Sequence, residues 1–144
     1  ATSCSEESSG LRVLRISPLS PRGLGRAAGL MLRWTLSSWR ARRLAEQHFG
    51  KHSYDLVYAT SPAVALWALI LWATRGAARR SYLYVVDFFP FHQRAIGLVP
   101  GGPLLSFARW AEAALMRRFD VIGCMSERNV EYLRRHYRLR PEQR

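Results

Sequence analysis

The chain has 144 residues, which is enough for one domain with a buried core. Its 22 basic and 10 acidic residues give a formal net charge of +12, carried by arginine because Lys51 is the only lysine. This charge favours polyanionic partners, namely nucleic acid, anionic lipid headgroups or phosphorylated substrates. The two cysteines lack metal-ligand spacing, which argues against a zinc site or a disulfide framework and favours a reducing compartment.

The polar residues 1–10 are expected to be a disordered lead-in, and they lack the basic and apolar regions of a signal peptide. The segment LRVLRIS (11–17) has the composition of a strand. The two prolines and the glycine of PLSPRG then predict an extended loop.

Residues 23–49 are predicted to form an amphipathic helix. Arg26, Arg33 and Arg40 recur every seventh residue, opposite an apolar face. That face consists of Ala27, Ala28, Met31, Trp34, Ala45 and Phe49. Two interpretations stay open: the arginines form the solvated side of a packed helix, or the helix lies on anionic lipid with Trp34 and Trp39 near the headgroups.

The 19 residues from Leu56 to Thr74 carry no charge, and this length is close to that of a bilayer span. However, Ser61-Pro62 interrupts the run directly after the β-rich YDLVYAT (54–60). We therefore expect a strand buried on both faces, a turn, and an apolar helix over 63–74. Ser61 is the predicted N-cap of that helix, Pro62 its first residue, and the basic RGAARR its end.

The remaining segments continue the alternation of strands and helices. SYLYVVDF (81–88) and FDVIGCM (119–125) are predicted strands, with Cys124 as a buried apolar residue, and 103–118 is a predicted helix. Ser126 is expected to cap a last helix that ends near Tyr137. The order predicts an α/β fold with a Rossmann-like parallel sheet, right-handed crossovers and helices on both faces.

All strands of such a sheet end at one edge, where ligands bind. The residues expected there are Ser17, Pro18, Thr60, Ser61, Pro62, the segment from Asp87 to His92, Ser126 and Glu127. Ser61 and Ser126 begin helices, so each either holds a phosphate or carboxylate or simply caps its helix.

Asp87 follows an apolar run, so its carboxylate needs partners or a shifted pKa. It could orient a sugar hydroxyl, act as a base, or cap backbone amides. His92 either donates to an anionic group or packs among the neighbouring aromatic residues. The sequence lacks GxGxxG, Walker A, GxSxG and HExxH motifs, which argues against dinucleotide oxidation, ATP hydrolysis and serine hydrolysis.

Three stretches resemble the amino-terminal domain of family 4 glycosyltransferases, particularly bacterial enzymes of capsule, O-antigen and exopolysaccharide synthesis. They are YDLVYATSPAVALWA, YVVDFFPFHQRAIGL and RRFDVIGCMSERNVEYLRRHY. The resemblance covers about residues 11–138 and rests on the D-x-x-P loop and the D-V-I-x-x-M-S unit, which occur in the family's order and spacing.

The resemblance implies a GT-B enzyme with two Rossmann-like domains facing each other across a cleft. The amino-terminal domain receives the acceptor, and the carboxyl-terminal domain holds a nucleotide-sugar as donor substrate. Such enzymes retain the anomeric configuration and generally need no metal. By the matching motifs, Asp87 is the candidate catalytic residue, and the expected acceptor- or phosphate-binding positions are Thr60, Ser61, Pro90, His92 and Ser126.

Two departures from the family pattern shape the expected organisation. Nothing before Leu11 resembles the usual glycine-rich turn, and no donor domain is present. We therefore expect residues 11–138 to be an incomplete glycosyltransferase amino-terminal domain, with 139–144 as the start of a linker. Such a chain is expected to be inactive alone, with the donor domain supplied in cis or in trans.

The acceptors of such enzymes are often polyprenyl-diphosphate-linked sugars, so a cytoplasmic enzyme peripheral on the inner membrane is expected. The predicted membrane surface consists of Arg26, Arg33, Arg40, Trp34 and Trp39. One alternative is a non-enzymatic phosphate- or nucleic-acid-binding module, although arginines spread over helix ends and outer faces argue against nucleic acid. The other is a membrane-recruiting subunit of a split glycosyltransferase.

Overall fold

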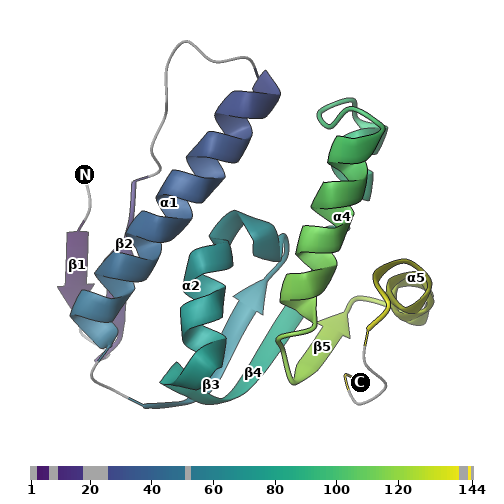
Figure 1. Ribbon diagram of the computed structural model, residues 1–144. Helices are drawn as coiled ribbons and strands as arrows, with labels where there is room; N and C mark the ends of the chain where they lie inside the picture. The colour runs from purple at the N-terminus through teal and green to yellow at the C-terminus, as the bar shows by residue number, and fades with distance from the viewer. Residues whose placement is uncertain (1–2, 7–9, 18–25, 51–52, 140–142, 144) are drawn as a thin grey trace.

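The structure is a computed structural model that describes residues 3–6, 10–17, 26–50, 53–139 and 143. Its centre is a parallel three-stranded sheet flanked by helices, which confirms the predicted Rossmann-like α/β class (Figure 1). The strands lie in the order β3-β4-β5 and comprise β3 (Tyr54–Thr60), β4 (Ala78–Val85) and β5 (Val121–Cys124).

The helices confirm the predicted alternation to within a few residues. They are α1 (Arg26–Phe49), the 3₁₀ helix η1 (Ala63–Leu66), α2 (Trp67–Trp72), the π-helical η2 (Ala73–Ala77), α3 (Phe91–Ala95), α4 (Pro103–Met116) and α5 (Glu127–Tyr137). The uncharged run from Leu56 to Thr74 is thus strand, turn and helix, as expected. Among the residues that the structure describes, no helix is long and apolar enough to cross a membrane.

Strand β4 begins three residues earlier than predicted and ends at Val85. Gly76, the second-last residue of η2, has a φ of 140°, which favours glycine and breaks the helical conformation before β4. Arg79 and Arg80 therefore belong to β4 and do not close the helix. At this exposed start of the strand, Arg79 Nη1 lies 3.7 Å from Asp55 Oδ1 on β3.

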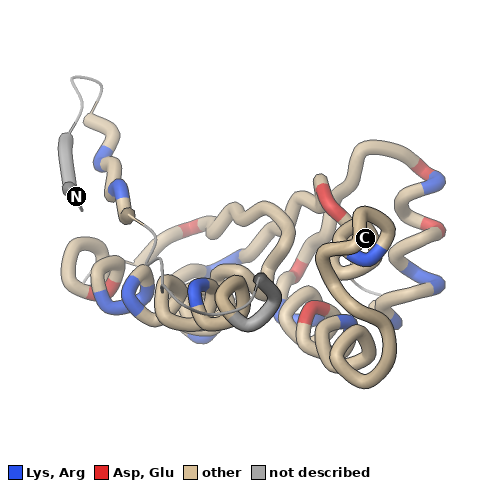
Figure 2. The backbone as a smooth tube through the Cα atoms, turned by 90° about the horizontal axis from the view of Figure 1, so that it is seen from above, with Lys and Arg blue, Asp and Glu red and all other residues tan. Residues whose placement is uncertain are grey.

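Three of the helices that flank the sheet lie together on one of its faces. The strand order β3-β4-β5 does not reverse, so two right-handed crossovers must lie on the same face. Helices α1, α2 and α4 accordingly form one layer (Figure 2), beneath which Leu83 and Val85 are completely buried. On the other face Leu56 is 56% exposed and Tyr58 59% exposed, so the expectation that β3 is buried on both faces is wrong.

A separate antiparallel ribbon precedes the sheet. It consists of β1 (Ser3–Glu6) and β2 (Arg12–Arg15). Part of the expected disordered lead-in is therefore a strand, and the predicted strand 11–17 is not part of the parallel sheet, because β2 pairs with β1. Ser17 consequently does not join the carboxyl edge of that sheet, and Pro18 lies outside the described residues.

The hydrophobic core lies between the sheet and the helix layer. Its largest members are fully buried and come from β4, the end of α4, the turn after it, and α5: Leu83, Val85, Met116, Phe119 and Tyr137. Full burial of each large apolar side chain contributes roughly 1.5–3 kcal/mol. This core holds the carboxyl ends of β3 and β4 and the loops that follow them in fixed positions.

Candidate functional site

The loops that follow β3 and β4 are tied together by Ser61. Its hydroxyl oxygen accepts hydrogen bonds from the backbone N–H groups of Val86, at 3.1 Å, and Asp87, at 2.8 Å. Its own N–H donates to the carbonyl of Tyr84 at 3.1 Å. Ser61 is not the N-cap predicted from sequence, because Pro62 occupies that position before η1. Its hydroxyl instead fixes the backbone from which Asp87 projects.

Asp87 lies at the carboxyl end of β4 with both carboxylate oxygens engaged. His92 Nδ1 lies 2.9 Å from Oδ1, and Gln93 Nε2 donates to Oδ2 at 2.6 Å. The side chain is 24% exposed, so the prediction that this acid needs partners is confirmed. Sequence reasoning missed Gln93, because its contact depends on the short helix α3 turning back towards β4.

His92 faces solvent with 59% of its side chain exposed, so the interpretation as a packing residue among aromatics is wrong. The hydrogen bond to Asp87 favours the tautomer with the proton on Nδ1 and leaves Nε2 as the nitrogen for a ligand. A carboxylate-oriented imidazole of this kind can accept a hydrogen bond, and then a proton, from a hydroxyl group.

Glu112 on α4 supports the site from within the core and was not identified from the sequence. It is completely buried, and its carboxyl oxygens accept hydrogen bonds from the N–H groups of Ala63, at 2.8 Å, and Val64, at 2.7 Å. Burial raises the pKa of Glu112 to about 7. The two N–H donors act in the opposite direction, and the negative charge of Asp87 adds to the rise. Glu112 thus holds the start of η1 directly after Ser61.

Tyr137 fixes the other side of the Asp87 loop. Its hydroxyl donates to the carbonyl oxygen of Phe89 at 2.6 Å, and burial raises the pKa of this phenol. An aromatic wall formed by Phe91, Tyr132 and His136 stands beside it, with the Phe91 and Tyr132 ring centres 5.6 Å apart. The loop between β4 and α3 is therefore held by backbone, side-chain and aromatic contacts.

The remaining predicted site residues have different positions. Thr60 is exposed at the end of β3. Pro90 is fully buried, so its side chain shapes the loop and does not contact a ligand. Ser126 is the N-cap of α5, as predicted, and accepts a hydrogen bond from the Asn129 N–H at 3.3 Å. Cys124, predicted to be buried, is only half-buried because it lies on the edge strand β5.

The predicted membrane residues of α1 do not all share one exposed face. Trp34 packs against Phe89, with ring centres 5.3 Å apart, and so points into the helix layer, away from the expected headgroup position. Trp39 lies on the outer side, edge-on to Trp67. Arg33 is exposed, whereas Arg40 is half-buried, with Nη1 3.5 Å from the carbonyl oxygen of Ser17; the side chain of Arg26 lies outside the described residues.

Comparison with known proteins adds one finding. A family model described as "Glycosyl transferase 4-like domain" matches residues 2–144. No curated protein and no solved structure gave a significant match. Within the described segments, no group of three or more His, Cys, Asp and Glu side chains is arranged to hold a metal ion.

Proposed function

This chain belongs to the family of glycosyl transferase 4-like domains, and we propose that it is the acceptor-side half of a retaining glycosyltransferase. In this proposal the complete enzyme moves a sugar from a nucleotide-sugar to a lipid-linked saccharide in the synthesis of a cell-surface polysaccharide. The donor domain is joined in cis or supplied in trans. Family membership supports glycosyl transfer, and the carboxyl edge of the sheet supports the acceptor role.

The observation that carries this proposal is the Asp87–His92 pair. An acceptor hydroxyl donates a hydrogen bond to His92 Nε2. The hydroxyl loses its proton to His92 as its oxygen bonds to the anomeric carbon on the same face of the sugar from which the nucleoside diphosphate leaves, so the anomeric configuration is retained. The carboxylate of Asp87 holds the ring and stabilises its charged form. Gln93 and the Ser61 clamp keep that carboxylate in place.

Thr60 and Ser126 are proposed as further acceptor contacts at the same edge. Ser126 stands at the start of the 11-residue helix α5, where backbone N–H groups and the helix dipole favour a phosphate oxygen. A diphosphate that links the acceptor sugar to its lipid is such a group. We place the protein in the cytoplasm, peripheral on the inner membrane, with Arg33 and Trp39 of α1 towards anionic headgroups.

Acceptor binding can be tested by amide NMR titration of the ¹⁵N-labelled chain. A synthetic farnesyl-diphosphate-linked glucose is expected to shift the signals of residues 87–93, whereas UDP-glucose is expected to shift none of them. His92→Ala should weaken binding of the glycolipid at least tenfold, since the group that receives the hydroxyl is lost. The matched control, His48→Ala in α1, should bind like the parent.

Transfer of sugar is the second readout. The chain alone is expected to transfer no glucose from UDP-glucose to the glycolipid. Binding of UDP-glucose at residues 87–93, or glycolipid binding that His92→Ala leaves unchanged, would contradict the acceptor assignment.

A further inference from the structure

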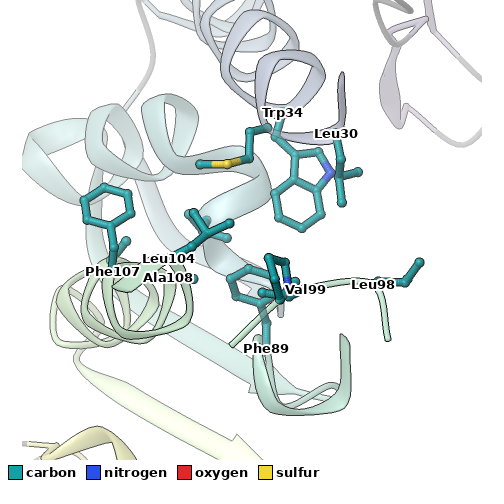
Figure 3. Close-up of a pocket in the computed structure, with 12 residues that line it drawn as sticks. Leu30, Trp34, Phe89, Leu98, Val99, Leu104, Phe107 and Ala108 are labelled. Carbon is teal, nitrogen blue, oxygen red and sulfur yellow. The ribbon is translucent and has the colours of Figure 1, made fainter. Parts of the chain in front are cut away.

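An apolar groove runs between α1 and α4 on the helix layer. One hollow has about 530 Å³ of empty volume, part of it open to solvent, and only apolar residues line it. The part of this hollow that can hold a ligand is about 70 Å³, and a second hollow beside it along α4 adds about 460 Å³, which lies in the usual range of about 300–1,000 Å³ for small-molecule sites. Trp34 of α1 and Phe107 of α4 stand on its two sides, with Phe89 and Val99 at one end (Figure 3).

A second hollow extends this space along α4. It shares with the first hollow the residues Met31, Trp34, Val64, Phe107 and Ala111, and it reaches Arg118 at the end of the helix. The two hollows therefore lie side by side along these five side chains, and together they are called the groove. An elongated, apolar space of this kind is complementary in shape to an extended hydrocarbon chain.

One end of the groove adjoins the proposed acceptor site. The backbone carbonyl of Gln93 accepts hydrogen bonds from Leu98, at 2.8 Å, and Val99, at 3.2 Å, and both residues line the groove. The side chain of the same Gln93 holds Asp87. Gln93 therefore holds both the Asp87 carboxylate and this end of the groove.

A cation lies next to the loop that lines this end of the groove. Arg94 is exposed on α3, two residues after His92, and its guanidinium is 3.4 Å from the position that a Cβ would take on Gly101, in the loop before α4. An arginine at this junction suits a phosphate, which it can bind through two parallel hydrogen bonds. Arg94 therefore lies beside the loop whose residues Leu98 and Val99 line this end of the groove, where it can bind the phosphate of a ligand whose hydrocarbon chain occupies the groove.

The surroundings of the groove favour an anionic lipid. Phe107 is 54% exposed and Trp110 is 63% exposed along its mouth, and large exposed apolar patches mark interaction sites. Helix α1 carries five arginines and one glutamate, Glu46, which is paired with Arg42. The single glutamate of α4 is buried. The helix layer is therefore apolar and cationic, as membrane-surface helices are.

We propose that this groove binds the hydrocarbon chain of the lipid that carries the acceptor saccharide, with the lipid phosphate at Arg94. The proposal rests on the proposed function for the identity of that lipid, but chain binding itself requires neither a sugar nor transfer. It assigns to α1, η1 and α4 the role of holding the acceptor by its lipid part while the polar end lies at His92.

Binding can be measured by calorimetry with farnesyl phosphate, which has a hydrocarbon chain and a phosphate but no sugar. Ala111→Phe places a ring in the part of the groove common to both hollows and should weaken binding at least tenfold. The same substitution at Ala78, on the opposite face of the sheet, should leave affinity within twofold. Geranyl phosphate should bind at least tenfold more weakly than farnesyl phosphate, because each buried CH₂ contributes roughly fourfold.

Two further variants keep the test decisive if Ala111→Phe does not fold. Phe107→Asp changes an exposed residue and should also weaken binding tenfold by placing a negative charge in the mouth of the groove. Arg94→Gln should weaken binding of farnesyl phosphate but not of farnesol. Unchanged affinity in Phe107→Asp, or equal affinity for geranyl and farnesyl phosphate, would overturn the groove assignment.

Vesicles of phosphatidylglycerol brominated on the acyl chains show whether the groove binds the acceptor lipid or the acyl chains of bulk membrane lipid. In a variant whose other four tryptophans are replaced by phenylalanine, quenching of Trp34 by these vesicles is expected to fall at least threefold when farnesyl phosphate is bound. Quenching that farnesyl phosphate does not reduce would assign the groove to bulk lipid and overturn the proposal. Farnesyl phosphate binding combined with no shift by the glycolipid at residues 87–93 would count against the acceptor function, not against the groove.

Discussion

Glu112 couples the stability of this domain to pH, and Glu112→Gln is the substitution that reveals the coupling. In the folded protein the carboxyl group is completely buried, and burial raises its pKa from 4.5 to about 7. Between these pH values the folded protein keeps a proton that the unfolded chain has released. The stabilisation from this group is therefore fully present below pH 4.5 and is lost as the pH rises to about 7.

The expected magnitude follows from the width of this interval. From pH 4.5 to about 7, at about 1.4 kcal/mol per pH unit, the free energy of unfolding falls by roughly 3 kcal/mol through this residue. In Glu112→Gln that dependence disappears. The variant also turns an amide NH₂ towards one of the N–H groups of Ala63 and Val64, which costs about 1–3 kcal/mol for the lost acceptor. The difference between parent and variant should thus be largest near pH 5 and shrink towards pH 8.

Urea unfolding at pH 5, 6, 7 and 8, followed by circular dichroism, measures this difference directly. The control is Glu46→Gln on α1, which removes an accessible ion pair with Arg42 and should change stability by less than about 1 kcal/mol. A difference between parent and Glu112→Gln that stays constant from pH 5 to pH 8 would refute the reasoning, because the buried carboxyl group would then titrate as in the unfolded chain.

Two other substitutions test contacts that position the site and the sheet. Ser61→Ala removes the acceptor of the Val86 and Asp87 N–H groups and should lower the free energy of unfolding by about 1–3 kcal/mol. Ser61→Thr should restore most of this loss. An alanine variant as stable as the parent in urea would contradict a stabilising role of these two hydrogen bonds. Gly123→Ala places a Cβ against the hydroxyl of Tyr82 and should cost about 1–3 kcal/mol, which Tyr82→Ala in the same chain should partly relieve; strictly additive changes in a double-mutant cycle would exclude this contact as the cause.

The strands of the parallel sheet could be predicted because their sequence signals are local. The solvent exposure of one face of the sheet could not be predicted. Apolar runs between helical segments, together with the proline and serine positions, identify β3, β4, β5 and their crossovers. Whether a strand is buried on one face or both depends on whether the strand order reverses, and no single strand carries that information. Leu56 and Tyr58 were therefore expected in the core, although the unreversed order leaves their face open.

The candidate site shows the same division between local and distant causes. An acid at the end of an apolar strand needs partners, so Asp87 could be identified from its position alone. The acceptor for the first N–H groups of η1, however, comes from Glu112, which follows Ala63 by 49 residues. A serine before a proline predicts an N-cap, and only the tertiary structure assigns that role to a glutamate and leaves Ser61 to hold the Asp87 loop.

Helix α1 shows how one helix can serve both the core and the proposed membrane surface. Trp34 and Trp39 are five positions apart, about 140° around the helix, so they cannot share a face. Trp34 packs on Phe89, next to the Asp87 loop, while Trp39 and Leu36 are exposed on the outer side. If the outer side lies on a membrane, the inner side fixes the distance between the bilayer and the acceptor site. The helix that attaches the protein would then also set the depth from which a lipid-linked acceptor reaches His92.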